Sequence, residues 1–380
     1  MARIVVGSTL VRYPLGGMSS WILSWLLGFS RLGHDVYFVE KSGWAKACYD
    51  VARGIMTDDC SYGVQCTNKL LGRYGLQNNW CFIDSEGRYH GITAGQVEKI
   101  FKSTDVFVDL EWDEWFDEAS EAGLRVFVDG EPGWFQMILE HKIRSGEELP
   151  SYDYHFTMGR NIGTSASPVP TAGIHWRPLF NPVLTDIFCY EPVHSDAPFT
   201  TVMQWRAHRQ LEFDGVIYGQ KDVEFEKFMD LPARIEAPME IAVSGHDVPR
   251  QRLMDAGWHV RNADQVAVDV DSYRSYIVAS RGEFSVAKNV FVATNNGCFM
   301  DRGGHYLATG RPVVQQDTGF SSHLPCGEGL FAVRTVEEAI GAMEEINSSF
   351  ERHSRRAREI AVEFLSAEKV LSDFLLEIGL

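Results

Sequence analysis

The residues with the clearest capacity for chemistry lie in one stretch of the C-terminal half, Asn295 to Phe320. Here Asp301 is expected to cap a helix that runs from Arg302 to about Thr309 and ends at Gly310. The start of such a helix offers unpaired backbone N–H groups, and an arginine adds a planar fork of donors. This combination suits a diphosphate group. An ordinary turn with a surface arginine is the alternative interpretation.

A second cluster has the sequence RGEFSVAK and ends at Lys288. Lys288 could pair with a phosphate, and Glu283 could accept hydrogen bonds from ribose or sugar hydroxyl groups. For each of them, a solvated loop charge is the alternative.

Carboxylates follow two short apolar runs in the N-terminal half. Asp109 ends one run, Asp129 ends the next, and Glu131 follows two residues later. Because an open parallel sheet places its ligand crevice at the carboxyl ends of its strands, these groups are expected to face a ligand. Asp129 or Glu131 could act as a general base toward a hydroxyl if burial raises its pKa toward neutrality. Asp109 with Glu111 is the competing pair.

Tryptophans stand beside these carboxylates and could bind an acceptor. Trp112 and Trp134 could form a platform for a sugar ring or an aromatic aglycone, although most large aromatic residues belong to the core. His305 is a further candidate base, but its position beside the candidate diphosphate site favours a hydrogen bond to the bound ligand.

The cysteines give no sign of a metal centre. All seven lack a C-x-x-C pair and any cysteine–histidine spacing typical of a metal site, so we expect no metal and a reducing, cytoplasmic environment. Asp269-Val-Asp271 lies in a polar connector, so no acidic motif is expected to hold a metal-bound diphosphate. A metal-independent reaction follows, in which a helix dipole and cationic side chains stabilise the leaving group.

Short β-branched runs alternate with helical patterns along the whole chain, which predicts an α/β fold with parallel sheets. The first series of predicted strands covers residues 3–7, 36–39, 106–109 and 125–129, and the second covers 199–203, 239–243, 291–294 and 311–315. The G-x-G-x-x-G dinucleotide signature is absent. A proline-rich segment before residue 193 is expected to link two domains, and the last helix carries an apolar stripe that must cover another surface.

The order of these motifs resembles that of GT-B glycosyltransferases. The stretch His305-Tyr-Leu-Ala-Thr-Gly310-Arg-Pro312-Val-Val314 resembles the helix and strand that bind the nucleotide sugar's diphosphate in that family. The N-terminal Gly16-Gly17 loop and helix resemble the family's opening loop. The resemblance implies two Rossmann-like domains facing across a cleft: residues 1–185 for the acceptor, 186–360 for the nucleotide sugar, and a helix over 361–380 that crosses back to the first domain.

The resemblance also implies the donor-binding residues, while two family patterns are missing. Gly297 and His305 stand where retaining members carry a Glu-x7-Glu pair, and the His-Cys-Gly-type signature of inverting members is absent. The residues expected to contact the donor are Gly16, Gly17, Glu283, Lys288, Asp301, Arg302, Gly303, Gly304, His305 and Asp317.

The amino-acid composition and net charge limit the number of domains and the classes of binding partner that we expect. The 380 residues are 45% hydrophobic and 23% charged, which predicts about two globular domains, and 35 basic against 52 acidic residues give a net charge of −17. A field of that sign is expected to exclude nucleic acid. No apolar run reaches the roughly 20 residues of a membrane span. A homodimer is one option for the assembly.

These observations predict a glycosyltransferase that moves a sugar from a nucleotide donor to a hydroxyl of a small molecule or glycoside, without a cofactor, in bacterial natural-product biosynthesis. The alternatives are a nucleotide-sugar epimerase of the same architecture and a noncatalytic nucleotide-sugar or glycan-binding protein.

Overall fold

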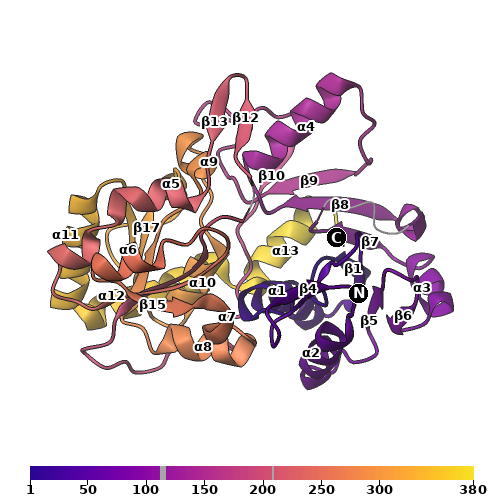
Figure 1. The fold of residues 1–380 in the computed structure, drawn as a ribbon. Coiled ribbons are helices and arrows are strands. Elements are labelled where there is room, and N and C mark those ends of the chain that lie inside the picture. The colour runs from indigo at the N-terminus through magenta and orange to yellow at the C-terminus, as the bar shows by residue number, and fades with distance from the viewer. Residues whose placement is uncertain (112–116, 208) are drawn as a thin grey trace.

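The computed structural model describes residues 1–111, 117–207 and 209–380, which form two α/β halves that lie side by side (Figure 1). Trp112, an expected acceptor-binding residue, lies outside these ranges. The N-terminal half is built on an eight-stranded sheet of order β10-β9-β8-β7-β1-β2-β5-β6, in which only β6 is antiparallel to its neighbour. Its strands are β1 (Arg3–Gly7), β2 (Asp35–Lys41), β5 (Trp80–Ile83), β6 (Tyr89–Gly91), β7 (Val106–Asp109), β8 (Leu124–Asp129), β9 (Tyr154–Thr157) and β10 (Trp176–Pro178).

The C-terminal half is built on a six-stranded parallel sheet of order β15-β14-β11-β16-β17-β18. Its strands are β11 (Phe199–Gln204), β14 (Met239–Ser244), β15 (His259–Asn262), β16 (Gly282–Ser285), β17 (Val313–Gln316) and β18 (Leu330–Val333). Two hairpins lie outside the sheets: β3 (Cys48–Asp50) with β4 (Ile55–Thr57), and β12 (Leu211–Phe213) with β13 (Val216–Tyr218).

Helices cover both sheets, as expected for parallel strands joined by crossovers. They are α1 (Gly16–Arg31), α2 (Ser61–Arg73), α3 (Ala94–Phe101), α4 (Trp134–Ser145), α5 (Lys221–Phe225), α6 (Arg250–Asp255), α7 (Ala263–Val266), α8 (Val270–Val278), α9 (Asn289–Ala293), α10 (Asp301–Ala308), α11 (Val336–Ser348), α12 (Phe350–Ile360) and α13 (Ala367–Glu377).

The predicted strand over residues 291–294 is wrong, because this run belongs to α9 and the loop after it. The sheet instead takes the preceding β16 segment, which lies between β11 and β17 and is buried throughout. Short apolar runs do not distinguish a buried strand from a buried helix turn, so neighbouring segments decide which run enters the sheet.

The chain returns to the N-terminal half at its end. Val183 and the segment around Leu365 exchange backbone hydrogen bonds of 2.8 and 2.9 Å, and α13 then lies along α1 (Figure 1). Phe374 of α13 packs against Trp25 and Phe29 of α1 and against Phe156 of β9. The apolar stripe of the last helix therefore covers the core of the first half.

Asparagine contacts join the two halves next to the candidate site. The Asn161 backbone N–H donates to the Asn296 carbonyl at 2.9 Å, its side-chain amide donates to the Asn295 carbonyl at 2.8 Å, and the Asn296 amide donates to the Pro132 carbonyl at 2.8 Å. Gly297 has φ +83°, and a Cβ there would lie 2.8 Å from the Asn161 nitrogen, so this crossing requires glycine. Among the described residues, no helix combines the length and apolar character that a membrane crossing needs.

Candidate active site

The candidate site lies where the carboxyl end of β8 meets the segment that follows β16. Lys288, only 9% exposed, donates from Nζ to Glu131 Oε1 at 2.5 Å and to the other oxygen of the same carboxylate. Glu131 belongs to the turn after β8, so this ion pair spans the two halves of the molecule. Two residues expected to serve different substrates are therefore partners here.

A second ion pair lies deeper, within the C-terminal half. Arg302 donates from Nε to Glu283 Oε1 at 2.5 Å, from Nη2 to the Ser285 hydroxyl at 2.7 Å and from Nη1 to the Val202 carbonyl at 2.5 Å. Glu283 is fully buried, and its second carboxylate oxygen has no hydrogen-bond partner in the part of the chain that the structure describes. Burial raises the pKa of its carboxyl, although Arg302 opposes that rise. The geometry places Arg302 on protein acceptors, so its predicted contact with a diphosphate stays a prediction.

Lys221 is a basic residue at this site that the sequence did not single out. It is partly buried at the start of α5, and no hydrogen bond or ion pair joins its ammonium group to any residue within 1–111, 117–207 or 209–380. Burial, together with the neighbouring positive charges of Arg302 and Lys288, lowers its pKa to about 7. A lysine that opens a five-residue helix has no sequence pattern around it that indicates a binding site, so only the fold shows that it lies near Arg302 and Lys288.

Asp301 differs from its predicted role as a helix cap. Met300 is the capping position of α10, Asp301 is the first helical residue, and no side-chain cap forms. The Asp301 carboxylate is partly buried, and among the described residues it has no hydrogen bond or ion pair. A cap would have used this carboxylate, so its actual position leaves it available.

The remaining predicted residues of α10 are packed inside the C-terminal half. A Cβ on Gly303 would lie 2.8 Å from Phe299 Cζ, and one on Gly304 would lie 2.8 Å from Val183 Cγ2. His305 is fully buried and stacks on Phe188, with the two ring centroids 4.3 Å apart. Burial lowers the pKa of His305 to about 4. These three residues shape α10 and its packing, and a direct contact with the donor stays a prediction.

The predicted glycines of the first loop lie against the C-terminal half. Gly16 donates its N–H to the Ala267 carbonyl at 2.7 Å, and a Cβ there would lie 2.3 Å from the Asp269 carbonyl oxygen. A Cβ on Gly17 would meet nothing closer than Tyr273 at 4.0 Å. Gly16 therefore allows α1 to touch the other half, whereas Gly17 has open space.

Asp317, at the end of β17, is engaged in local contacts. Its Oδ1 accepts the Gly319 N–H at 2.8 Å, and its Oδ2 accepts the Ser321 hydroxyl at 2.9 Å and an Arg334 N–H at 2.8 Å. The geometry favours a turn-stabilising role over donor binding.

The acceptor side is held by fully hydrogen-bonded carboxylates. Asp129 accepts from Gln136 Nε2 and the Thr157 hydroxyl, each at 2.7 Å, and from the Glu131 backbone N–H at 2.8 Å. Burial raises the pKa of Asp129 to about 6 although these hydrogen bonds oppose the rise. Asp129 thus fixes the turn that presents Glu131, whose side chain is 38% exposed. Trp134 opens α4 after this turn and is partly buried against the core.

Glu40 plays a similar part for the loop after β1. It is fully buried and accepts N–H groups of Leu10 at 2.9 Å, Val11 at 2.6 Å and Arg12 at 3.0 Å, with the Arg12 guanidinium also at 3.0 Å. The sequence placed Glu40 at the end of a strand but gave it no role. The structure shows that it fixes the first loop of the N-terminal half.

The architecture is similar to that of several solved glycosyltransferase structures. No protein-family model matches the chain, and no curated protein matches its sequence. It is similar in structure to an alpha-glucosyltransferase in complex with UDP and a 13-mer DNA (TM-score 0.59, 9% identity, covering 100% of this chain and 99% of the other). It is also similar to HepE from Anabaena in complex with UDP and glucose (TM-score 0.56, 10% identity, covering 100% of each chain). A third similar structure is AviGT4, a glycosyltransferase of avilamycin A biosynthesis (TM-score 0.51, 9% identity, covering 99% of this chain and 97% of the other).

One of these likenesses corrects the expectation drawn from net charge. The prediction that nucleic acid is excluded as a partner is wrong, because the alpha-glucosyltransferase with the same fold is bound to DNA. The physical reason is that net charge sums the whole surface, whereas binding depends on the local charge around a cleft. The two parallel sheets, the returning C-terminal helix and these full-length likenesses show that the protein has the GT-B fold of glycosyltransferases.

Proposed function

We propose that the protein is a glycosyltransferase that uses a nucleoside diphosphate sugar as its donor. The observation that carries the proposal is the Lys221 ammonium group, which is partly buried beside two other cations and has no hydrogen bond or ion pair with the described residues. A partly buried ammonium group that lacks a direct hydrogen-bonding partner gains from an incoming anion, so the site favours one.

The pairing of charged groups at the site supports the binding of a diphosphate. Of the three neighbouring cations, Lys288 is paired with Glu131 and Arg302 with Glu283, whereas Lys221 has no hydrogen bond or ion pair among the described residues, although the Asp301 carboxylate is a negative charge close to it. A diphosphate would take Lys221 as its first partner and could draw Lys288 away from Glu131. The partly buried Asp301 carboxylate, near enough to Lys221 to raise its pKa, would then accept hydrogen bonds from sugar hydroxyl groups.

The transfer step follows from these positions. The bond between the anomeric carbon and the diphosphate oxygen breaks, a bond from the acceptor oxygen to that carbon forms, and the acceptor proton passes to a base. We assign the base to Glu131, because it lies at the junction of the two halves and its side chain is partly exposed. Asp129, whose oxygens already accept three hydrogen bonds, is assigned the positioning of that turn. Lys221 would stabilise the charge that develops on the leaving diphosphate.

The acceptor is proposed to be a hydroxyl of a small molecule or glycoside in a natural-product pathway, by analogy with AviGT4. The DNA-bound neighbour makes a nucleic-acid hydroxyl the second class to include in the same assay.

Calorimetry with UDP and other nucleoside diphosphates tests the proposal. Lys221→Met should weaken the preferred nucleotide by about 10- to 150-fold, the scale of a charge-assisted hydrogen bond of roughly 1.5–3 kcal/mol. Lys102→Met is the matched control, because Lys102 pairs with Glu98 on the exposed surface at the end of α3. This variant should bind the nucleotide as tightly as the wild type does. Equal affinity in Lys221→Met and wild type would remove Lys221 from the donor site.

Incubation with a panel of nucleotide sugars separates the three candidate functions. Slow release of nucleoside diphosphate, accelerated by an acceptor, supports the transferase. Interconversion of the sugar would indicate an epimerase, and tight binding without turnover would indicate a binding protein. Either of these last two results would overturn the proposal.

A further inference from the structure

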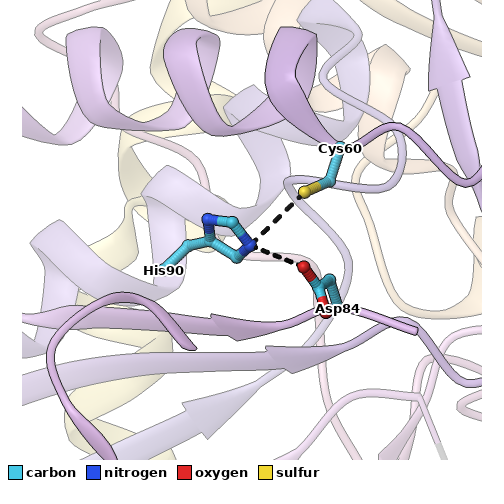
Figure 2. Close-up of side chains that lie close together, drawn as sticks. All are labelled: Cys60, Asp84 and His90. Atoms are coloured by element: carbon cyan, nitrogen blue, oxygen red, sulfur yellow. Dashed lines mark hydrogen bonds and ion pairs between the residues drawn. The ribbon is translucent and has the colours of Figure 1, made fainter. Parts of the chain in front are cut away.

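Three potential metal ligands that are distant in sequence meet in the N-terminal half. Cys60 directly precedes α2, Asp84 directly follows β5, and His90 lies in β6 (Figure 2). His90 Nε2 lies 3.5 Å from Cys60 Sγ and 2.9 Å from Asp84 Oδ2, so both partners converge on one ring nitrogen. No other group of three such ligands with this proximity occurs within residues 1–111, 117–207 and 209–380.

Protons alone satisfy this arrangement poorly. A neutral imidazole carries at most one hydrogen on Nε2, yet that nitrogen faces both a sulfur and a carboxylate oxygen. Cys60 and Asp84 are each only 6% exposed, so solvent contributes little to either. One cation among the three heteroatoms would satisfy all of them at once.

The three ligand atoms lie within 4.8 Å of one another, and two of their separations can be compared with those of tetrahedral zinc. With Zn–S near 2.3 Å and Zn–N and Zn–O near 2.0–2.1 Å, a tetrahedral site separates S from N by about 3.6 Å and N from O by about 3.3 Å. The observed Sγ–Nε2 distance of 3.5 Å already matches, and the Nε2–Oδ2 distance of 2.9 Å needs to widen by only about 0.4 Å to meet that geometry.

We propose that Cys60, Asp84 and His90 bind one zinc ion, with water as the fourth ligand. The thiolate and the carboxylate supply two negative charges against the 2+ ion, and the mixed sulfur, nitrogen and oxygen set suits zinc better than magnesium or calcium. The Cys60 thiol proton leaves to solvent on binding, and the neutral His90 ring carries its single proton on Nδ1 so that the Nε2 lone pair binds the ion. The His90 side chain, 28% exposed, leaves one side of the site open for water.

A second layer of contacts already orients the carboxylate. Asp84 Oδ1 accepts the backbone N–H groups of Glu86 at 2.9 Å and Arg88 at 3.0 Å. Arg88 Nε also donates to Oδ2 at 2.8 Å, but its side chain is 64% exposed and can turn into solvent when the ion binds. Backbone donors that hold a ligating carboxylate are typical of built metal sites.

Zinc at this point would join the start of α2 to the β5–β6 hairpin. The same end of α2 lies on the first loop, because a Cβ on Gly63 would lie 1.9 Å from the Val11 carbonyl oxygen. The ion would therefore stiffen a loop at the carboxyl edge of the sheet while remaining apart from the Lys221 site.

Cobalt(II) titration of the purified, metal-free full chain tests the proposal without relying on activity. We expect saturation at one equivalent, with a thiolate-to-cobalt absorption band that zinc displaces. Cys60→Ser should abolish the band, and His90→Gln should weaken metal binding by more than tenfold. Cys66→Ser is the matched control, because Cys66 is a partly buried cysteine on the same helix outside the cluster, and it should behave as the wild type.

A thermal melt supplies the second readout. Zinc should raise the melting temperature of the wild type and of Cys66→Ser, and should not raise that of Cys60→Ser. If the wild type gives no band and no shift, or if Cys60→Ser retains both, the proposal is overturned.

Discussion

The carboxyl edges of the two sheets face the same junction but treat their charged groups in opposite ways. On the N-terminal edge, Asp129 and Glu40 are buried and accept hydrogen bonds from backbone and side-chain donors around them. On the C-terminal edge, Lys221 and Asp301 have no partner among the described residues, and Glu283 keeps one buried oxygen unpaired.

This difference separates groups that hold loops from groups that await a ligand. A buried carboxylate with several donors stabilises one loop conformation and has little capacity left for substrate. A partly buried charged group with no direct hydrogen-bonding partner keeps its capacity for a ligand and gains most when one arrives. This difference supports the proposal that the donor binds at the C-terminal edge, with Glu131 and Lys288 at the boundary between the two halves.

The largest expected effect tests the boundary. Glu131→Gln keeps size and removes basicity, so we expect the transfer rate to fall by roughly 10²–10⁴-fold while UDP affinity stays within a few-fold of wild type. Single-turnover rates at saturating donor measure it. Asp129→Asn is the companion variant and should lose less rate than Glu131→Gln. The reverse order would return the role of base to Asp129.

The next effect concerns the deep ion pair of the C-terminal edge. Arg302→Met leaves the fully buried Glu283 without its cation, so the free energy of unfolding should fall by about 3–5 kcal/mol. Urea denaturation measures it. Arg334→Met is the control, because Arg334 is 72% exposed and its pair with Asp317 should contribute only about 0–1 kcal/mol. Unchanged stability with weaker UDP binding would show that Arg302 serves the donor directly.

The two edges should also respond to pH in opposite directions. The pKa of His305 is near 4 in the folded protein, below its ordinary value of 6.5, so the unfolded chain binds the proton first as pH falls. Between pH 7 and pH 5 this destabilises the fold by about 2 kcal/mol. Burial raises the pKa of Asp129 from its ordinary 3.8 to about 6 in the folded protein, so over the same interval it stabilises the fold by about 1 kcal/mol.

Unfolding curves at the two pH values separate these contributions. His305→Phe should lose less stability on acidification than wild type, and Asp129→Asn should lose more. If both variants follow the wild-type pH dependence, neither burial effect operates as the geometry indicates.

The smallest expected effect is the pH dependence of donor binding. Free Lys221 has a pKa near 7, and a bound diphosphate would raise it, so binding takes up a proton above pH 7. UDP affinity should therefore fall by up to about tenfold, or about 1.4 kcal/mol, for each pH unit above 7. Calorimetry in two buffers of different ionisation enthalpy measures the proton uptake. Lys221→Met should flatten the dependence, and a wild type that binds equally at pH 7 and pH 9 would contradict the assignment.

The sequence alone determined the architecture and part of the candidate site. Buried strands such as Arg3–Gly7 and Val313–Gln316 have local apolar patterns that specify them, and the motif from His305 to Val314 indicated the GT-B fold that the structural likenesses confirm. Local patterns carry such information because the strand and helix periods are set by neighbouring residues.

Only the tertiary structure decided which charges are paired. Asp301 was expected to be a cap, and Glu131 and Lys288 were assigned to different substrates. Instead, the Asp301 carboxylate forms no hydrogen bond or ion pair with the described residues, and Glu131 and Lys288, 157 residues apart in sequence, form an ion pair. The positions of Cys60 and His90 in the sequence likewise do not match a spacing that is typical of metal sites. Pairing energies depend on separations of a few ångströms and on burial, and both are fixed only when the order of parallel strands brings distant loops to one edge.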